Sequence, residues 1–336
     1  MIKFGLVATA LVLGTSLTAH AQDTTTLRMQ SLMPAGSSAN AQFEAFAEQV
    51  AAMSGGRLVI EVLPVDSVVQ SDETLEAVGQ GILDGHFGSP GYFAGQDPAF
   101  GVLGAFVAGY ETPEQFQMFY DLGGGVELAR ELYADYNVYF VGSAFWQPEA
   151  IPSRVPLRSV EDFNGVKIRA PGGTTGQVFA KLGASVVNLP GSEIFQALSS
   201  GVIDATDYST LGQNAQTGLY DIAKYTIYPS ITSMPSTDIS INADKWEALP
   251  EDLRAIVEGA TREFSANLSA VTFMDDQDAY RQIQEDGVEI INWEPEERRK
   301  LREVASEVVA EYAKGSETAQ KVYDAHITFM KKINLL

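Results

Sequence analysis

The chain has 336 residues, in which 22 lysines and arginines stand against 44 aspartates and glutamates, giving a formal charge of −22. This acidity excludes nucleic acid as a partner, because a phosphate backbone is bound by clustered basic side chains, and it leaves anion capture to a strong local positive charge. The absence of cysteine excludes a disulfide framework and a thiol nucleophile, and three histidines in the whole chain argue against a zinc site.

The N-terminal segment has the pattern of a secretory signal peptide. Lys3 precedes the apolar run 4–17, and the sequence AHA at 19–21 has the spacing of a cleavage site. We expect residues 1–21 to be removed and the mature chain to lie in the periplasm without a membrane anchor; a retained anchor is the alternative. No later stretch reaches the ~18 unbroken apolar residues of a membrane helix.

Beyond residue 25, strand-like and helix-like segments alternate, which favours an α/β fold with largely parallel sheets. A helix with Leu75, Val78 and Ile82 on one face is expected to end near Gly85. The hydroxyl of Thr112, followed by proline, predicts another helix start. Strands are expected at 26–31, 57–64, 137–142, 166–170, 185–190 and 202–208.

Two longer segments bear on how the chain is divided. Residues 143–159 contain three prolines, and we interpret them as a loop that crosses between two lobes. Residues 251–286 contain no proline and predict one helix of about 50 Å, at 1.5 Å per residue. A helix of that length exceeds the width of one small lobe and suits a brace between two.

The strand 166–170 ends in a basic side chain. Because side chains alternate along a strand, Lys167 and Arg169 share one side while Ile168 faces the core. Pro171 ends the strand, which puts Arg169 at a carboxyl end, where open α/β sheets bind ligands. On this pattern alone, a surface ion pair is an equal alternative for Arg169, and Lys167 is interpreted as a surface residue.

Other polar or aromatic side chains occupy comparable places. Asp207 and Tyr208 end the last predicted strand, where an aspartate is otherwise a frequent helix cap. Trp146 and Gln147 lie in the crossover loop and either line a cleft or close a domain junction. The glycine-rich segment 172–177 lacks the lysine of a phosphate-binding loop, and no serine–histidine–aspartate set or H-E-x-x-H motif is present. The sequence therefore predicts that the protein is not an enzyme.

Six stretches carry a likeness to a known family. They are DFNGVKIRAP, LGASVVNLPGSEIFQALSSGVIDATD, GLYDIAKY and INADKWEALP, with MPAGSS and SGGRLVIEVLP nearer the N-terminus. In these stretches the chain resembles the substrate-binding proteins of tripartite ATP-independent periplasmic (TRAP) transporters, of the dicarboxylate-binding-protein type. The likeness extends over essentially the whole mature chain.

The resemblance implies a two-lobe α/β periplasmic binding protein fold, a flytrap joined by hinge strands and a long lobe-spanning helix. Lobe I is expected to comprise residues 22–143 and 235–274, and lobe II residues 144–234 and 275–336. The family also implies delivery of the bound solute to the large and small membrane subunits of a TRAP permease.

The same resemblance implies a ligand site. In the family, the arginine of the KIR-x-P stretch pairs with the ligand's carboxylate, and here that residue is Arg169. A planar guanidinium grips a carboxylate through two parallel hydrogen bonds, which a lysine does not reproduce. The residues after IDA line the cleft in relatives, which points to Asp207 and Tyr208. Polar contacts are further expected from Gln147 and Thr237, and apolar walls from Trp146, Tyr92 and Phe93.

The chain departs from relatives that bind 2-oxo and 2-hydroxy acids through a metal. Those relatives usually have Glu-Trp where this chain has Asp207 and Tyr208, and a further glutamate near the position of Ser233. No cofactor is therefore expected, and Asp207 is expected to orient Arg169. A calcium or sodium ion that bridges the ligand through Gln147, Asp207 and Tyr208 is the alternative.

These features predict a periplasmic receptor for a small organic anion, a monocarboxylate such as a 2-oxo or 2-hydroxy acid. A dicarboxylate, a sulfonate and a zwitterion such as ectoine are alternative ligands. Two other classes of protein remain as alternatives. One is a periplasmic enzyme on the same scaffold, which the lack of a recognisable set of catalytic residues disfavours. The other is a receptor for an ABC-type importer, which differs in its membrane partner.

Overall fold

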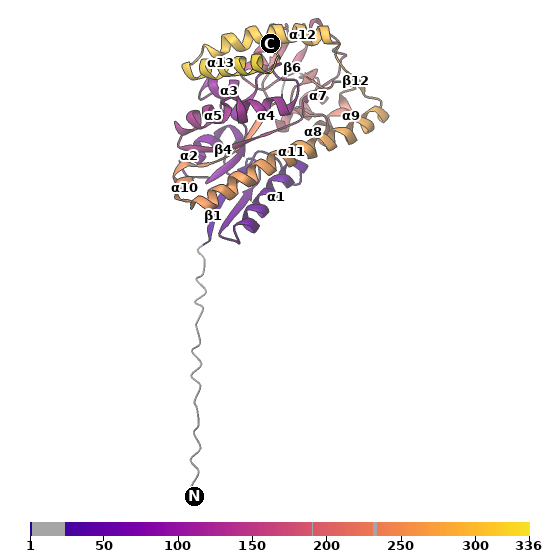
Figure 1. Cartoon of the computed structure of the whole chain (residues 1–336). Helices are drawn as coiled ribbons and strands as arrows, with labels where there is room; N and C mark the ends of the chain where they lie inside the picture. Colours follow the sequence, from indigo (N-terminus) through magenta and orange to yellow (C-terminus); the bar gives the residue numbers. More distant parts are fainter. Residues whose placement is uncertain (2–23, 190, 231–233) are drawn as a thin grey trace.

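The computed structural model describes Met1 and residues 24–189, 191–230 and 234–336, so residues 2–21 of the predicted signal peptide and Ser233 lie outside the described residues. Two β-sheets, each covered by helices, organise the described chain (Figure 1). We call the first sheet with its helices lobe I and the second sheet with its helices lobe II.

Lobe I is built on a five-stranded sheet. In sheet order its strands are β2 (Leu58–Leu63), β1 (Thr25–Ser31), β3 (Gly85–Gly88), β11 (Ser236–Asn242) and β4 (Val138–Phe145). β1 is parallel to β2 and β3, whereas β11 is antiparallel to β3 and β4, so the sheet is mixed and the expectation of largely parallel strands was wrong. Every residue of β11 is buried, because helices cover both faces of the sheet.

Lobe II contains shorter strands. In sheet order they are β12 (Glu289–Ile291), β10 (Tyr225–Ile227), β5 (Glu149–Ser153), β8 (Ala205–Thr206), β6 (Lys167–Arg169) and β7 (Ser185–Val187), with β9 (Ser209–Thr210) paired to β5. The segment 143–159 is therefore not one loop, which corrects the prediction from its prolines. β4 continues to Phe145, and β5 includes Pro152, whose missing N–H removes only one donor from the ladder.

The helices of lobe I are α1 (Ser38–Met53), α2 (Thr74–Gly79), α3 (Pro98–Gly104), α4 (Pro113–Leu122), α5 (Gly125–Ala134) and α10 (Ala243–Ala248). Those of lobe II are α6 (Thr174–Lys181), α7 (Ile194–Ser200), α8 (Leu211–Gln216) and α9 (Leu219–Ile222). The hydroxyl of Thr112 caps α4 by accepting from the N–H of Gln115 at 3.3 Å, as predicted. α2 ends six residues before Gly85, so Ile82 lies outside it and is 48% exposed, contrary to expectation.

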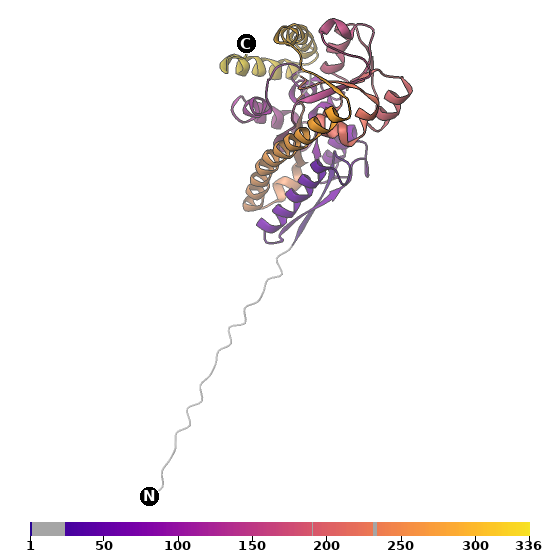
Figure 2. The same ribbon diagram turned by 90° about the vertical axis from the view of Figure 1, so that its right-hand side faces the viewer.

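The long helix α11 (Glu251–Glu285) is continuous, as the absence of proline predicted. Figures 1 and 2 show it running along both lobes, where it packs on α1 and β4 of lobe I and on α8 of lobe II. Asp275 accepts a hydrogen bond from Ser38 of α1 at 2.5 Å. The next residue, Asp276, accepts one from the main-chain N–H of Gly212 in α8 at 2.7 Å. Asp275 also accepts a hydrogen bond from Nε2 of Gln216 in α8 at 3.4 Å, so its carboxylate contacts both lobes.

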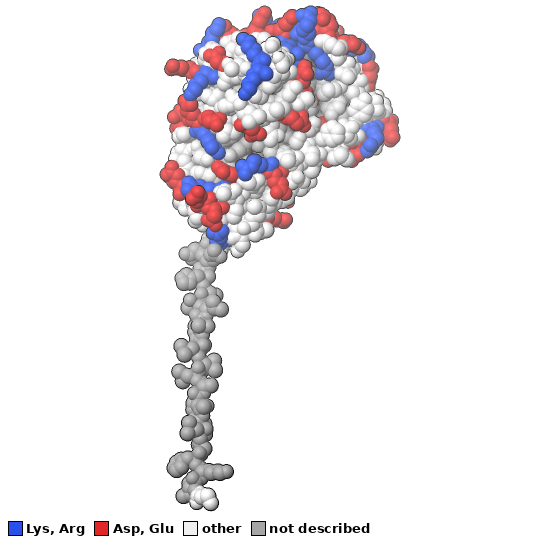
Figure 3. Space-filling view, viewed as in Figure 1, with Lys and Arg blue, Asp and Glu red and all other residues white. Residues whose placement is uncertain are grey.

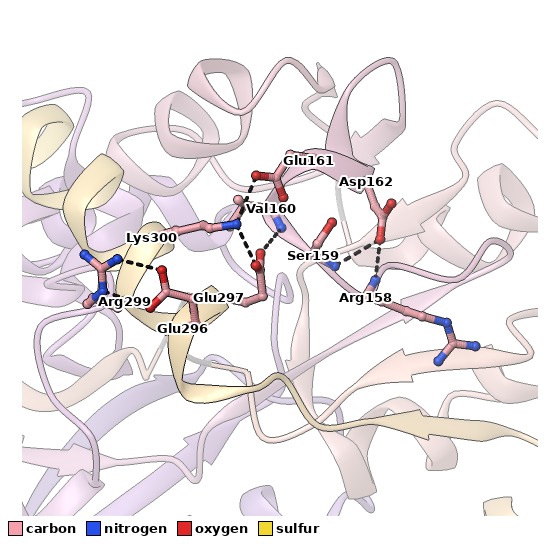
Figure 4. A network of polar contacts seen from close by, with 9 residues as sticks. All are labelled: Arg158, Ser159, Val160, Glu161, Asp162, Glu296, Glu297, Arg299 and Lys300. Atoms are coloured by element: carbon pink, nitrogen blue, oxygen red, sulfur yellow. Dashed lines mark hydrogen bonds and ion pairs between the residues drawn. The ribbon is translucent and has the colours of Figure 1, made fainter.

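Two C-terminal helices, α12 (Pro295–Ala313) and α13 (Glu317–Lys332), lie side by side in Figure 1. α12 contacts α6 and α3, whereas α13 contacts α3 and α5. The start of α12 is attached to the short helix η3 (Val160–Phe163) by Lys300, which donates to Glu161 at 3.1 Å and to Glu297 at 2.7 Å (Figure 4). Glu297 also accepts from the N–H of Val160 at 2.9 Å. Since this network is largely exposed, it sets orientation more than it adds stability.

Aromatic side chains fill the core on both faces of the first sheet. On one face, the rings of Phe87 and Phe264 meet edge to face with centroids 5.0 Å apart. On the other, His326 of α13 is fully buried and stacks on Phe119 with centroids 3.7 Å apart. It shares a hydrogen bond with the hydroxyl of Tyr110 at 2.8 Å. Burial lowers the pKa of His326 to about 3, so the imidazole that docks α13 is neutral at pH 7.

Acidic and basic side chains interleave over the face of the molecule shown in Figure 3. The formal charge of −22 is therefore not gathered there into a single acidic patch. Among the helices of the described ranges, none combines the length and the apolar character needed to cross a bilayer.

Candidate functional site

Arg169 is the last residue of β6, which lies between β7 and β8. Its strand neighbours are Val187 on one side and Thr206 on the other, and only 7% of its surface is exposed. Lys167, two residues earlier, is half exposed and donates to the main-chain oxygen of Gly201 at 2.5 Å. The surface reading therefore holds for Lys167 but not for Arg169.

The hydrogen-bond partners of Arg169 within the described chain are main-chain carbonyls. Its Nε donates to Leu189 at 3.0 Å, and its Nη1 donates to Asp207 at 2.6 Å. The guanidinium lies over the ring of Tyr208, with Cζ 5.6 Å from the ring centroid. A guanidinium has five N–H donors, so these contacts fix the side chain and leave donors for a ligand. Neutral carbonyls do not balance a buried charge, whereas a bound carboxylate does.

Two buried carboxylates lie in the same part of lobe II. Asp207, 1% exposed, directly follows β8, and its N–H donates to the main-chain oxygen of Arg169 at 2.8 Å. Glu149, 6% exposed, is the first residue of β5 and pairs with Thr210 of β9. Thr210 caps α8 by accepting from the N–H of Gln213 at 3.3 Å. Asp207 is therefore not the N-cap of α8, the helix that follows it. Glu149 was not among the sequence-predicted site residues.

A tyrosine from each lobe shares the electrostatic surroundings of this group. Tyr92 lies in the short helix η2 (Pro90–Phe93) of lobe I and is 44% exposed, whereas Tyr208 in lobe II is half-buried. Desolvation by the surrounding protein raises the pKa of both phenols, the charge on Arg169 opposes the rise, and Glu149 adds to it. Because charge effects fade over short distances, Arg169 and Glu149 lie within electrostatic range of both phenols. Both phenols remain protonated at pH 7 and are able to donate hydrogen bonds.

Three other predicted site residues have partners in the segment that joins the lobes. Gln147 donates through Nε2 to the hydroxyl of Ser269 in α11 at 3.0 Å and to its main-chain oxygen at 3.2 Å. Thr237, 2% exposed, donates to the main-chain oxygen of Ala144 at 3.0 Å. Trp146 is 6% exposed and belongs to the core between the first sheet and α11. The structure therefore does not place these side chains in direct contact with Arg169.

Phe93, the neighbour of Tyr92, is fully buried in lobe I. Its ring stacks on His86 with centroids 5.6 Å apart, and His86 shares a hydrogen bond with Asp238 of β11 at 3.1 Å. The hydroxyl of Tyr133 donates to the other carboxylate oxygen of Asp238 at 3.1 Å. This buried network fixes η2 on the sheet and so positions Tyr92.

Acidic and imidazole side chains do not gather into a metal centre in the part of the chain that the structure describes. No group of three or more histidine, cysteine, aspartate or glutamate residues there is arranged to hold a metal ion. This part of the protein instead contains the cation Arg169, the phenols of two tyrosines and two buried carboxylates. Arg169 and the two phenols suit recognition of an anion through charge and hydrogen bonds, whereas the two carboxylates disfavour further negative charge.

The two sheets, the helix that joins them and the buried arginine define a two-lobe receptor for a small solute. The sequence model of the bacterial extracellular solute-binding proteins, family 7, matches residues 29–315. The chain belongs to this family, the DctP-type periplasmic solute-binding proteins of TRAP transporters, and its role is that of a non-enzymatic receptor. The predicted family, fold class and absence of enzymatic function are confirmed.

Individual relatives agree with this assignment. The chain is 29% identical over 295 residues to the monocarboxylate 2-oxoacid-binding periplasmic protein of Nostoc sp., covering 86% of this chain and 80% of that protein. A TRAP periplasmic solute-binding protein from Rhodobacter sphaeroides, solved in an apo open form, is 39% identical, with a TM-score of 0.79 and coverage of 93% of this chain and 99% of that one. Another from Pseudoalteromonas atlantica, solved with bound sodium and pyruvate, shares the fold at 23% identity and a TM-score of 0.80, with coverage of 93% and 96%.

Proposed function

We propose that the protein binds a small organic acid anion, a monocarboxylate of the 2-oxo or 2-hydroxy type, between its lobes and delivers it to a TRAP membrane permease. The observation that carries this proposal is the burial of Arg169 beside two neutral carbonyls and a ring. A cation in such surroundings gains most from an anionic ligand. The Nostoc relative named for 2-oxoacids and the structural neighbour solved with pyruvate support the choice of ligand class.

Arg169 is held in place before any ligand arrives. Because two carbonyls already fix the guanidinium, little side-chain entropy is lost when a carboxylate binds to its remaining donors. Tyr208 lies against the same guanidinium and offers its hydroxyl from lobe II. Tyr92 offers a hydroxyl from lobe I. A ligand that contacts both lobes favours the closed arrangement, since the full contact energy is gained only there.

The remaining predicted residues serve the same site in this proposal. Asp207 orients Arg169 through the main chain, since its oxygen accepts from Nη1 and its N–H donates to the oxygen of Arg169. Gln147, Thr237 and Trp146 shape the site through the segment that joins the lobes, and Phe93 does so through η2.

The proposal also covers export, assembly and motion. Residues 1–21 act as a cleaved signal peptide, and the permease's large and small subunits take up the solute from the closed receptor. The proposed bounds are residues 22–143 and 235–274 for the first lobe and 144–234 and 275–336 for the second, although β4 extends to Phe145 and α13 packs on α3 and α5 of lobe I. The contacts of the Asp275 carboxylate with α1 and with α8 support a boundary in this part of α11.

A thermal-shift screen of the mature chain tests the ligand class. Pyruvate and L-lactate are compared with succinate, ectoine and a small alkyl sulfonate, each with and without calcium or sodium. A monocarboxylate that binds only the folded protein raises its melting temperature by a few degrees at about 100 times its dissociation constant. A rise only with succinate, ectoine or the sulfonate contradicts the proposal. A rise that requires the cation favours an ion bridging Gln147, Asp207 and Tyr208.

A further inference from the structure

We propose that Glu149 makes the receptor prefer monocarboxylates that carry a hydrogen-bond donor, a hydroxyl or an ammonium group, beside the carboxylate. This inference rests on the proposed function, in which Arg169 binds the carboxylate itself. Within the proposed ligand class it favours 2-hydroxy over 2-oxo acids, and it extends that class to 2-amino acids.

The fold carries Glu149 to the site through strand pairing. Glu149 begins β5 and pairs with Thr210, and the next residue, Ala150, pairs with Ser209, which directly follows Tyr208. At its other end β5 pairs with β8, which in turn pairs with β6 at Arg169. The side chain of Glu149 is 6% exposed, so its charge is shielded little by water.

The charge of Glu149 acts on a tyrosine from each lobe. Desolvation raises the pKa of Tyr208 in lobe II and of Tyr92 in lobe I, the charge on Arg169 opposes that rise in both, and the charge on Glu149 adds to it in both. Glu149 and Arg169 therefore act on one shared region from different strands. A ligand bound at Arg169 in that region experiences both charges.

The chemistry of a carboxylate decides what such a ligand gains from Glu149. An ionised carboxylate accepts hydrogen bonds and donates none. A 2-oxo acid offers only acceptor oxygens, so its negative charge and lone pairs are repelled by the negative charge of Glu149. A 2-hydroxyl or 2-ammonium group donates to it, and a donor bonded to a charged acceptor is among the stronger hydrogen bonds. The hydroxyls of Tyr92 and Tyr208 serve either kind of ligand, which makes Glu149 the group that discriminates.

Calorimetric titration of the mature protein with pyruvate, propionate, L-lactate and L-alanine tests the inference. We expect L-lactate or L-alanine to bind about tenfold more tightly than pyruvate and propionate, and whichever binds more tightly identifies the donor. In Glu149→Gln, which keeps the shape and removes the charge, the preference falls below about threefold and pyruvate binds at least as well as in the unmodified protein. Glu307→Gln, on an exposed face of α12, keeps the preference of the unmodified protein.

Several results overturn the inference, and one separates it from the proposed function. Tighter binding of pyruvate than of either donor-bearing acid, or a full donor preference in Glu149→Gln, contradicts a role for Glu149. If these acids bind and Arg169→Lys abolishes their binding but no donor preference exists, the proposed function stands and this inference falls. If none of the four acids binds the unmodified protein, both fall. The near-ultraviolet circular dichroism of each variant checks that its fold is intact.

Discussion

Arg169 and Asp207 exchange two hydrogen bonds through the main chain. The Nη1 of Arg169 donates to the oxygen of Asp207 at 2.6 Å, and the N–H of Asp207 donates to the oxygen of Arg169 at 2.8 Å. Asp207, which directly follows β8, thus holds both the backbone and the side chain of Arg169 at the end of β6. The guanidinium is oriented by neutral groups and keeps its charge for an anion.

Gly191→Ala tests the position of Tyr208. A Cβ at residue 191 would lie 2.8 Å from the ring of Tyr208, so the ring must move away from its place beside Arg169. We expect roughly tenfold weaker ligand binding in a calorimetric titration, because a hydroxyl and a ring contact are displaced together. Gly172→Ala is the matched control, since no atom lies within 4 Å of its added Cβ. Equal affinity of the two variants would show that Tyr208 is not part of the site.

Tyr92→Phe tests the contribution of lobe I. The variant removes one hydroxyl and keeps the ring, and the residue is 44% exposed, so the melting temperature should not change. We expect affinity for the ligand to fall by about five- to tenfold, the usual worth of one hydrogen bond. Tyr280→Phe, at a 36% exposed position on α11, is the control and should bind as the unmodified protein does. Unchanged affinity of Tyr92→Phe contradicts a contact from lobe I.

Asp276 predicts a dependence of stability on pH. Burial raises the pKa of this carboxyl from 3.8 to about 6, against the hydrogen bonds from Gly212 and Tyr228. Because the folded-state pKa exceeds the unfolded one, its contribution to stability is fully present below pH 3.8 and is lost as the pH rises through 6. Between pH 5 and 7.5 this group should lower the free energy of unfolding by roughly 1.4 kcal/mol.

Urea denaturation of Asp276→Asn at several pH values measures this effect. The asparagine cannot ionise, so the difference between the unmodified protein and the variant should change with pH over the same interval. Asp278→Asn, at a position 70% exposed on the same helix, should leave the pH profile as it is. Parallel profiles for Asp276→Asn and the unmodified protein would mean that Asp276 does not titrate in this range.

The long helix and the strand-end arginine could be predicted because each follows from local pattern. Residues 251–285 lack proline, and Arg169 is the last residue of a strand that Pro171 closely follows. Glu149 could not be found in this way. Three prolines around it predicted a loop, whereas pairing with strands distant in sequence makes residues 149–153 a strand and buries the carboxylate. Such pairing leaves no local signal.

The partners of the aromatic residues were likewise decided by tertiary structure. Phe93 and Tyr92 are neighbours in the sequence, yet Phe93 is fully buried against His86, whereas Tyr92 is 44% exposed and lies within electrostatic range of Arg169 and Tyr208. The short helix η2 separates them by turning successive side chains to different surroundings. A motif alone does not distinguish the two.

The most direct test of the central claim is calorimetric titration of Arg169→Lys with the monocarboxylate that binds the unmodified protein. The lysine keeps the charge but loses the two parallel N–H donors, and affinity should fall roughly a hundredfold or more. Lys167→Arg, two residues away on the same strand and half exposed, should bind as the unmodified protein does. If Arg169→Lys is folded and binds within about threefold of the unmodified protein, Arg169 is not the group that holds the carboxylate.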